Sequence, residues 1–277
     1  MKYLLAILAV LLPVWSTWGQ TNGSMISAVA VLTIHVSDTN VHQSVFQFLT
    51  DVLKLPVEYG PEQLGQRRYA AVYAGNMFIE PCGPFSNMEY PVKEFKALFF
   101  GLNCRSDKSS SSMAKDLERL NISYEQVSPD TIRVRNEILG GGVYLAISTK
   151  PQSKSDEDQE LTFQNTMKAN HRAGLGLEYV KEIWLGYTEP VHLQLWNEFL
   201  GASGKVEDQT WSLNNHQRIR LVKSGAKGVV GIVWKVRSLD TAESYLKRTR
   251  CYGRSINGRI ELDKNRTDGL TMYLSAE

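Results

Sequence analysis

Two polar residues in the first third of the chain have side chains that could bind a metal ion. His35 stands near the end of the run "VLTIHV", and Glu80 ends the run "MFIE". Sites for manganese, iron, nickel or zinc need about three imidazole or carboxylate ligands in one geometry. His35 is therefore either a metal ligand or a side chain on the wall of a pocket. Glu80 is a ligand, a catalytic group, or a strand-end carboxylate bonded to a nearby arginine or backbone N–H.

Other chemistries have no support in the sequence. It contains no G-x-S-x-G, H-E-x-x-H, P-loop or Cys-x-x-Cys motif. The net charge of +2 does not favour nucleic acid as a partner. The three cysteines leave room for one disulfide and a spare thiol, so a hydrophobic core must supply most of the stability.

The elements that must position His35 and Glu80 follow a pattern. Residues 28–36 alternate as a strand does, and residues 41–53 place their apolar side chains on one helical face, with Asn40 as the expected N-cap. Strand parity then directs three side chains of 28–36 to one side, namely Val31, Thr33 and His35.

A hairpin completes this first unit. The β-favouring runs 67–73 and 77–80 flank Gly75-Asn76, a dipeptide typical of a two-residue turn. Residues 28–85 are therefore predicted to form β-α-β-β-β. The pattern returns three times, with strands and helices expected at 95–103, 111–122, 131–135, 142–148, 179–187, 189–201, 216–222, 228–236, 239–248, 258–262 and 270–275.

The N-terminus differs from the rest of the chain. Lys2 is followed by the apolar run "YLLAILAVLLPVW" and then by small residues, which is typical of a secretory signal peptide over residues 1–19. The run is short for a membrane span, which needs about 20 residues. We expect a secreted or periplasmic protein with no membrane span after cleavage; an uncleaved membrane anchor is the alternative.

A polar, charged stretch separates the second unit from the third. Residues 151–165 contain few large apolar side chains and are predicted to be a linker. The predicted domains are then 26–150 and 166–277, each holding two units. Four unrelated α+β segments are the alternative.

The pattern resembles the vicinal oxygen chelate superfamily, which includes glyoxalase I, bleomycin-resistance proteins and extradiol dioxygenases. "IHVSDTNVHQSVFQFLTDVLKL" is similar to the family's first strand, V-x-D turn and helix, with Lys54 in place of a glycine. "GNMFIEP" resembles its glutamate-ending strand, and "VRSLDTAESYL" its helix entry, with Ser238 in place of an aspartate. The resemblance implies an α+β fold of four β-α-β-β-β modules, paired into two glyoxalase-like domains with curved mixed sheets, each forming a cup.

The family's metal ligands lie seven residues before the turn aspartate and at the last-strand glutamate. In the first domain Asp38 sets the first position at Val31, which cannot bind a metal, and Glu80 matches the glutamate. The second unit offers a position near Ala97 and Tyr144. His35 lies where glyoxalase-like members place residues that touch substrate, and the expected ligand-binding residues of this cup are Thr33, His35, Phe99 and Tyr144.

In the second domain Glu182 takes the first position if Glu189 replaces the turn aspartate, and the last strand offers Arg220 or Val222. The fourth unit offers Gly231 and Tyr273. Glu182 and Lys235 could form an ion pair, or Lys235 could meet an acidic ligand; Trp184 could stack on a ligand. The expected ligand-binding residues here are Glu182, Trp184, Lys235 and Tyr273.

These residues favour an exported protein that binds a small organic molecule in a cup without a complete metal site or other cofactor. The alternative is a metal-dependent lyase or dioxygenase using manganese, iron, nickel or zinc, with Glu80 and His35 as its weak ligand pair. A third possibility is a purely structural second domain. The resemblance also allows a homodimer.

Overall fold

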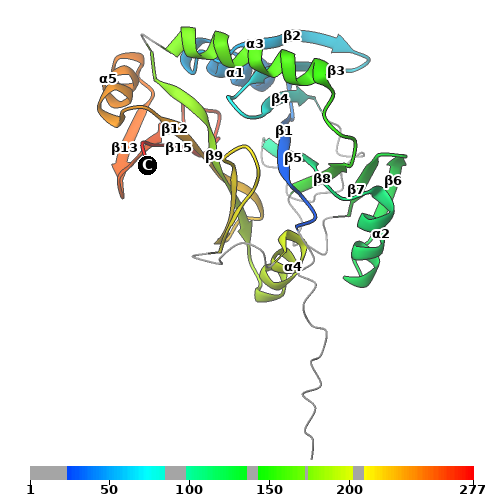
Figure 1. Ribbon diagram of the computed structural model, residues 1–277. Helices are drawn as coiled ribbons and strands as arrows, with labels where there is room; N and C mark the ends of the chain where they lie inside the picture. Colours follow the sequence, from blue (N-terminus) through cyan, green and yellow to red (C-terminus); the bar gives the residue numbers. More distant parts are fainter. Residues whose placement is uncertain (1–23, 85–97, 136–142, 172–173, 202–208) are drawn as a thin grey trace, which may run out of the picture.

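The computed structural model describes residues 24–84, 98–135, 143–171, 174–201 and 209–277 (Figure 1). The predicted signal peptide, residues 1–19, lies outside these ranges, as does Ala97. Within them the chain forms two mixed β-sheets and five α-helices. No helix in the described ranges has both the length and the apolar character needed to cross a membrane.

Sheet one has eight strands in the order β2-β3-β4-β1-β5-β8-β7-β6. Its two halves join where β1 and β5 pair antiparallel, and within each half the first strand pairs parallel with the last, β1 with β4 and β5 with β8. The strands are β1 (Ala28–Val36), β2 (Val57–Leu64), β3 (Arg67–Tyr73), β4 (Phe78–Gly83), β5 (Leu98–Arg105), β6 (Tyr124–Ser128), β7 (Thr131–Val134) and β8 (Val143–Ser148).

Sheet two repeats this arrangement with seven strands in the order β10-β11-β9-β12-β15-β14-β13. Its halves join through antiparallel β9 and β12, with β11 parallel to β9 and β15 parallel to β12. Its strands are β9 (Leu177–Tyr187), β10 (Thr210–Ser212), β11 (Arg218–Lys223), β12 (Gly228–Val236), β13 (Tyr252–Ile256), β14 (Arg259–Leu262) and β15 (Met272–Ser275). Three of the four predicted units show the full β-α-β-β-β pattern, and the third has one strand fewer among the described residues.

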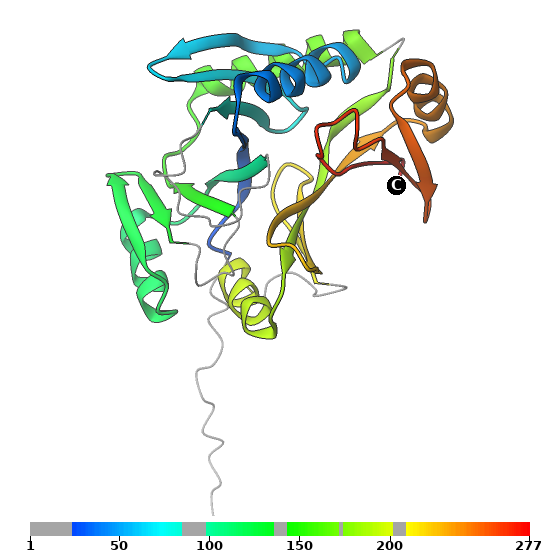
Figure 2. The same cartoon turned by 180° about the vertical axis from the view of Figure 1, so that it is seen from behind.

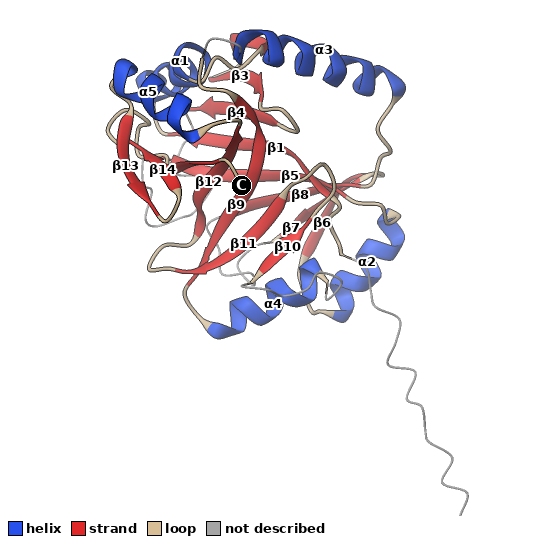
Figure 3. Ribbon diagram, turned by 60° about the vertical axis from the view of Figure 1, so that its left-hand side comes forward, coloured by secondary structure: helices blue, strands red, loops and turns tan. Residues whose placement is uncertain are grey.

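The helices lie at the outside of the strands (Figure 3). The second and fifth α-helices of the chain lie on opposite sides of the molecule, as the views from front and back both show (Figures 1 and 2). The helical segments are α1 (Thr39–Gln47) with a π-helical turn η1 (Phe48–Val52), α2 (Ser110–Arg119), α3 (Lys154–Asn170), α4 (Pro190–Leu200) and α5 (Leu239–Thr249).

Each sheet has one apolar face and one polar face. In β1, Leu32, Ile34 and Val36 are at most 1 % exposed and belong to the hydrophobic core. The residues between them are Val31, Thr33 and His35, which share the other face because side chains alternate along a strand. The same alternation in β9 and β11 buries Ile183, Leu185, Ile219 and Leu221 and leaves polar residues opposite.

The helix that follows β1 begins two residues earlier than the sequence predicts. Its N-cap is Asp38, not Asn40, because the Asp38 carboxylate accepts hydrogen bonds from the backbone N–H groups of Asn40 and Val41, at 2.8 and 2.9 Å. The Gly75-Asn76 hairpin is confirmed: Ala74 donates to Met77 O at 2.7 Å between β3 and β4.

Most of the expected linker, residues 151–165, belongs to the long helix α3, which continues to Asn170. Ser153 caps it through a reciprocal pair: its hydroxyl accepts from Asp156 N, and the Asp156 carboxylate accepts from Ser153 N. Phe163 stacks on Tyr73 with centroids 5.7 Å apart, and Glu160 pairs with Arg105 at 3.2 Å. The segment joins the two sheets, and it does so as a helix packed against sheet one.

Two side-chain amides join the sheets directly. Gln217, which is 2 % exposed, accepts from Val29 N and donates to Val29 O, both at 2.8 Å. Asn76 donates to Val180 O at 2.9 Å and accepts from Val180 N at 3.2 Å. Gln217 also donates to Asn76 O. The hydrophobic core runs through both sheets as one cluster. All three cysteines are free and buried: Cys82, Cys104 and Cys251.

Replacing Gln217 with leucine should destabilise the protein by about 2–4 kcal/mol, because both backbone groups of Val29 would lose buried partners. Urea unfolding followed by circular dichroism measures this loss. Gln194→Leu is the matched control, since Gln194 is exposed on α4. Equal unfolding midpoints for the two variants would contradict a joining role for Gln217.

Stability should fall as the pH drops from 6.5 toward 4. Burial lowers the pKa of His35 and of His171 to about 4, and positive Arg67 and Arg237 respectively add to the effect. Below pH 6.5 the unfolded chain therefore binds protons at these histidines that the folded chain does not bind. The contribution of the two neutral histidines to the free energy of unfolding is complete above pH 6.5 and is lost as the pH falls toward 4. Each histidine contributes roughly 3 kcal/mol to the loss at pH 4, since one pKa unit is about 1.4 kcal/mol.

The measurement is the urea midpoint at pH 7 and at pH 4.5 for the wild type, His35→Gln and His171→Gln. Each variant should show a smaller drop between the two pH values than the wild type. A drop that neither substitution reduces would show that other groups cause the acid sensitivity.

Candidate functional site

The polar face of sheet one gathers three predicted residues around a glycine. We call this face cup one, defined by Thr33, His35, Glu80 and Tyr144. Gly101 pairs with Thr33 and with Tyr144 in the sheet. A Cβ atom built on Gly101 would lie 3.1 Å from His35 Nε2, 3.3 Å from Thr33 Cβ and 3.5 Å from Tyr144 Cδ1. The three side chains therefore converge on one point above the sheet.

Glu80 lies in the same cup, held by two hydroxyl groups. Thr33 Oγ1 donates to its carboxylate at 3.2 Å, and the Tyr59 hydroxyl donates at 2.6 Å. Burial and the Glu80 carboxylate raise the pKa of Tyr59, so Tyr59 is a neutral donor at ordinary pH. Within the described ranges Glu80 makes no ion pair, so hydroxyls hold it in place of the arginine or backbone N–H considered from the sequence.

His35 is neutral at physiological pH. It is 7 % exposed, and burial lowers its pKa to about 4, with Arg67 acting in the same direction. Tyr144 accepts a hydrogen bond from Arg133 Nε at 2.7 Å. The backbone of Phe99 pairs with His35, but the side chain of Phe99 lies outside the described part of the structure.

The polar face of sheet two forms a second cup with a different composition. We call it cup two, defined by Glu182, Trp184, Arg220 and Tyr273. The indole N–H of Trp184 donates to the Glu182 carboxylate at 2.8 Å, and the rings of Trp184 and Tyr273 lie 4.7 Å apart. Glu182 is 3 % exposed. Gly231 permits this packing, because a Cβ there would lie 2.9 Å from Trp184 Cε3.

Arginines surround Glu182 and Trp184. Glu182 pairs with Arg218 at 2.8 Å and with Arg259 at 3.7 Å. Lys235 is not its partner, which corrects the ion pair expected from the sequence: the Lys235 ammonium instead donates to Ala276 O at 2.5 Å, because β15 lies directly beside it. The ring of Trp184 supports two guanidinium groups, of Arg220 at 5.8 Å and of Arg259 at 5.3 Å.

Arg220 has no carboxylate partner in the described part of the chain. Its contact there is with the ring of Trp184, whereas Arg218 and Arg259 both share Glu182. An arginine is always charged, so this side chain leaves a positive charge uncompensated on the cup wall. Burial lowers the pKa of nearby Lys181, the positive charges of Arg218 and Arg259 lower it further, and Glu182 opposes them.

The strand register identifies Arg220 as the counterpart of Glu80. Thr33 and Trp184 both stand five residues before the N-cap of the following helix, Asp38 and Glu189. Thr33 pairs with Glu80, and Trp184 pairs with Arg220. The choice between Arg220 and Val222 that the sequence left open is therefore decided for Arg220. The two cups carry opposite charges at matching positions.

The family's metal-ligand positions can now be tested against this donor set. Seven residues before the N-caps Asp38, Glu189 and Ser238 stand Val31, Glu182 and Gly231. Val31 and Gly231 supply no donor, and Glu182 is occupied by arginines. Among the described residues no three His, Cys, Asp or Glu side chains gather as a metal site requires. These residues do not fit a divalent metal.

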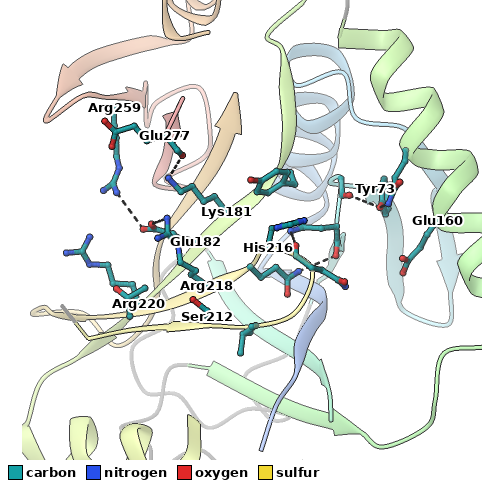
Figure 4. Close-up of a pocket in the computed structure, with 18 residues that line it drawn as sticks. Tyr73, Glu160, Lys181, Glu182, Ser212, His216, Arg218, Arg220, Arg259 and Glu277 are labelled. Atoms are coloured by element: carbon teal, nitrogen blue, oxygen red, sulfur yellow. Dashed lines mark hydrogen bonds and ion pairs between the residues drawn. The ribbon is translucent and has the colours of Figure 1, made fainter. Parts of the chain in front are cut away.

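A cavity of about 1190 Å³ opens between cup two and the edge of sheet one (Figure 4). Its walls include Lys181, Glu182, Arg218, Arg220 and Arg259 from sheet two. Tyr73 and Asn76 of the β3–β4 hairpin and Glu160 of α3 line its other end. The cavity thus needs both sheets, and its charged end is cup two.

Sequence reasoning identified part of this arrangement. Thr33, His35 and Tyr144 converge in cup one, and Glu182, Trp184 and Tyr273 converge in cup two. It missed Arg218, Arg259 and Tyr59. The alternation in "RIRLV" was an available signal, because it places Arg218 and Arg220 opposite the buried Ile219 and Leu221.

Comparisons with known proteins show which solved structures have a similar fold. No protein-family model matches the chain, and no curated protein is similar enough in sequence to match it. Solved structures do match. A variant of 4-hydroxymandelate synthase from Streptomyces coelicolor aligns with a TM-score of 0.62 at 11% identity, covering 90% of this chain and 92% of that one.

Two other solved structures also match this chain. The 2,3-dioxygenase LapB from Pseudomonas sp. KL28 aligns with a TM-score of 0.56 at 12% identity, covering 91% and 92% of the two chains. The Mn(II)-bound glyoxalase from Novosphingobium aromaticivorans aligns with a TM-score of 0.55 at 14% identity, covering 91% and 83%. The chain therefore shares the α+β fold of these solved structures, which is the kind of fold that the resemblance to the vicinal oxygen chelate superfamily implies.

Proposed function

We propose that this protein is an exported binding protein that holds a small organic anion in cup two without a metal ion. The observation that carries the proposal is Arg220, a guanidinium on the cavity wall with no carboxylate partner in the described ranges. A buried or half-buried arginine without a partner is costly, and an anionic ligand removes that cost.

The surroundings of Arg220 suit an anion rather than a cation. Lys181, Arg218 and Arg259 line the same end of the cavity; Glu182 pairs with Arg218 and Arg259, and Lys181 donates to Glu277 O. Burial lowers the pKa of Lys181, and the positive charges of Arg218 and Arg259 lower it further. The guanidinium groups of Arg220 and Arg259 both lie over the ring of Trp184, which holds these two positive charges close to each other where a carboxylate could bind them.

A metal-dependent lyase or dioxygenase is the competing function, and the Mn(II)-bound glyoxalase among the similar folds is its support. The donor set of this chain opposes it. Among the described residues, Glu80 of cup one is not part of a group of three His, Cys, Asp or Glu side chains, and cup two has Arg220 at the corresponding position, where its charge would repel a metal ion.

Arg220→Gln should weaken the binding of a carboxylate such as glucuronate or benzoate roughly 10- to 100-fold, because hydrogen bonds to a charged group are worth about 1.5–3 kcal/mol each. Isothermal titration calorimetry measures the change. Arg119→Gln is the control, since Arg119 is 53% exposed on α2, remote from the cavity. If both variants bind alike, or no carboxylate binds the wild type, the proposal is wrong.

Titration of the purified protein with Mn²⁺ or Fe²⁺ should show no stoichiometric binding, because the described residues of neither cup supply three donors. Elemental analysis of the isolated protein and calorimetry after chelator treatment provide the measurement. One tightly bound metal per chain that is lost in Glu80→Gln but retained in the control Glu118→Gln would favour the enzyme over the binding protein.

A further inference from the structure

Beyond its charged end, the wall of the cavity is lined mostly by polar rather than apolar side chains. Leu213 is the single aliphatic side chain among the described residues that line it. Pockets for drug-sized ligands are mostly apolar and measure about 300–1,000 Å³, so this cavity is both larger and more polar than that class. The uncharged lining that extends from cup two toward sheet one includes Asn76, Gln164, Tyr179, Ser212, Asn215 and His216.

Several of these groups have hydrogen-bonding capacity to spare. The side chains of Ser212 and Asn215 are exposed and make no hydrogen bond within the described ranges. Asn215 adopts a left-handed backbone conformation, with φ of 58°, and so does His216, with φ of 61°. The turn they form presents their side chains at the cavity wall. Such a lining suits a ligand rich in hydroxyl groups, which both donate and accept hydrogen bonds.

A ring platform lies midway along the cavity. Tyr179 and His216 lie with ring centroids 5.8 Å apart and planes inclined by 32°. In Figure 4, His216 stands between the cationic cluster of Arg220 and Arg259 on one side and Tyr73 with Glu160 on the other. An aromatic face of this kind packs against the C–H face of a pyranose ring while the rim bonds its hydroxyls.

We propose that the anion of cup two is the acidic end of a short carbohydrate. Its carboxylate pairs with Arg220, and a further sugar ring lies against Tyr179 and His216, pointing toward Tyr73. We place the carboxylate of the ligand at one end of the cavity because Lys181 and the lining arginines lie at that end. At the other end of the cavity, Glu160 already pairs with Arg105. This inference rests on the proposed function and adds the class of ligand.

Lactobionate is a suitable probe, because it carries one carboxylate at the end of a sugar unit. Lactose supplies a closely related disaccharide without the charge, and benzoate supplies the charge without hydroxyls. Calorimetry on the wild-type protein should show lactobionate binding at least tenfold more tightly than either. Tyr179→Ala should weaken lactobionate binding at least fivefold and leave benzoate binding unchanged, whereas Arg220→Gln should weaken both.

The remote substitution Tyr124→Ala is the matched control for Tyr179→Ala, since Tyr124 begins β6 at the far edge of sheet one. If benzoate binds in an Arg220-dependent way and lactobionate binds no better, cup two is an anion site and the carbohydrate inference is wrong. If neither acid binds, the proposed function itself fails. Equal loss of lactobionate binding in Tyr179→Ala and Tyr124→Ala would also overturn the sugar-ring contact.

Discussion

The arrangement of the whole molecule depends on two side-chain amides that satisfy backbone groups across the junction of the sheets. The ladder between β1 and β5 shifts register at Val29, and the ladder between β9 and β12 shifts near Val180. Such irregularities free backbone N–H and C=O groups. The Gln217 amide forms hydrogen bonds with both the N–H and the C=O of Val29, and the Asn76 amide does the same with Val180. At each register shift, a side-chain amide from the opposite sheet therefore bonds the freed backbone groups. The cavity lies beside these two contacts.

The paired units share a scaffold and differ in what they display on it. Register keeps Thr33 opposite Glu80 and Trp184 opposite Arg220, so one strand position carries a carboxylate in cup one and a guanidinium in cup two. Hydroxyls from Thr33 and Tyr59 stabilise the first, and the indole of Trp184 supports the second. In both sheets the opposite face packs into the hydrophobic core. The difference in chemistry lies wholly on the polar faces.

Much of the fold could be predicted from the sequence because strand and helix periods are local. The alternation around His35 and the Gly75-Asn76 turn specified their elements without reference to the rest of the chain. The helix α3 was harder, since its face is largely polar; the Ser153-x-x-Asp156 cap was its local signal. The partner of Glu182 could not be predicted, because Arg259 reaches it from a strand 77 positions later, and only the sheet order brings the two together.

Gly101 and Gly231 occupy matching places, each paired across the central ladder with the residue five before an N-cap. At either one, a single methyl group would press on the side chains that define its cup, 3.1 Å from His35 Nε2 in the first and 2.9 Å from Trp184 Cε3 in the second. Glycine-to-alanine exchange is among the smallest changes a gene can encode. Replacing one of these glycines with alanine would therefore fill part of one cup and leave the other cup unchanged.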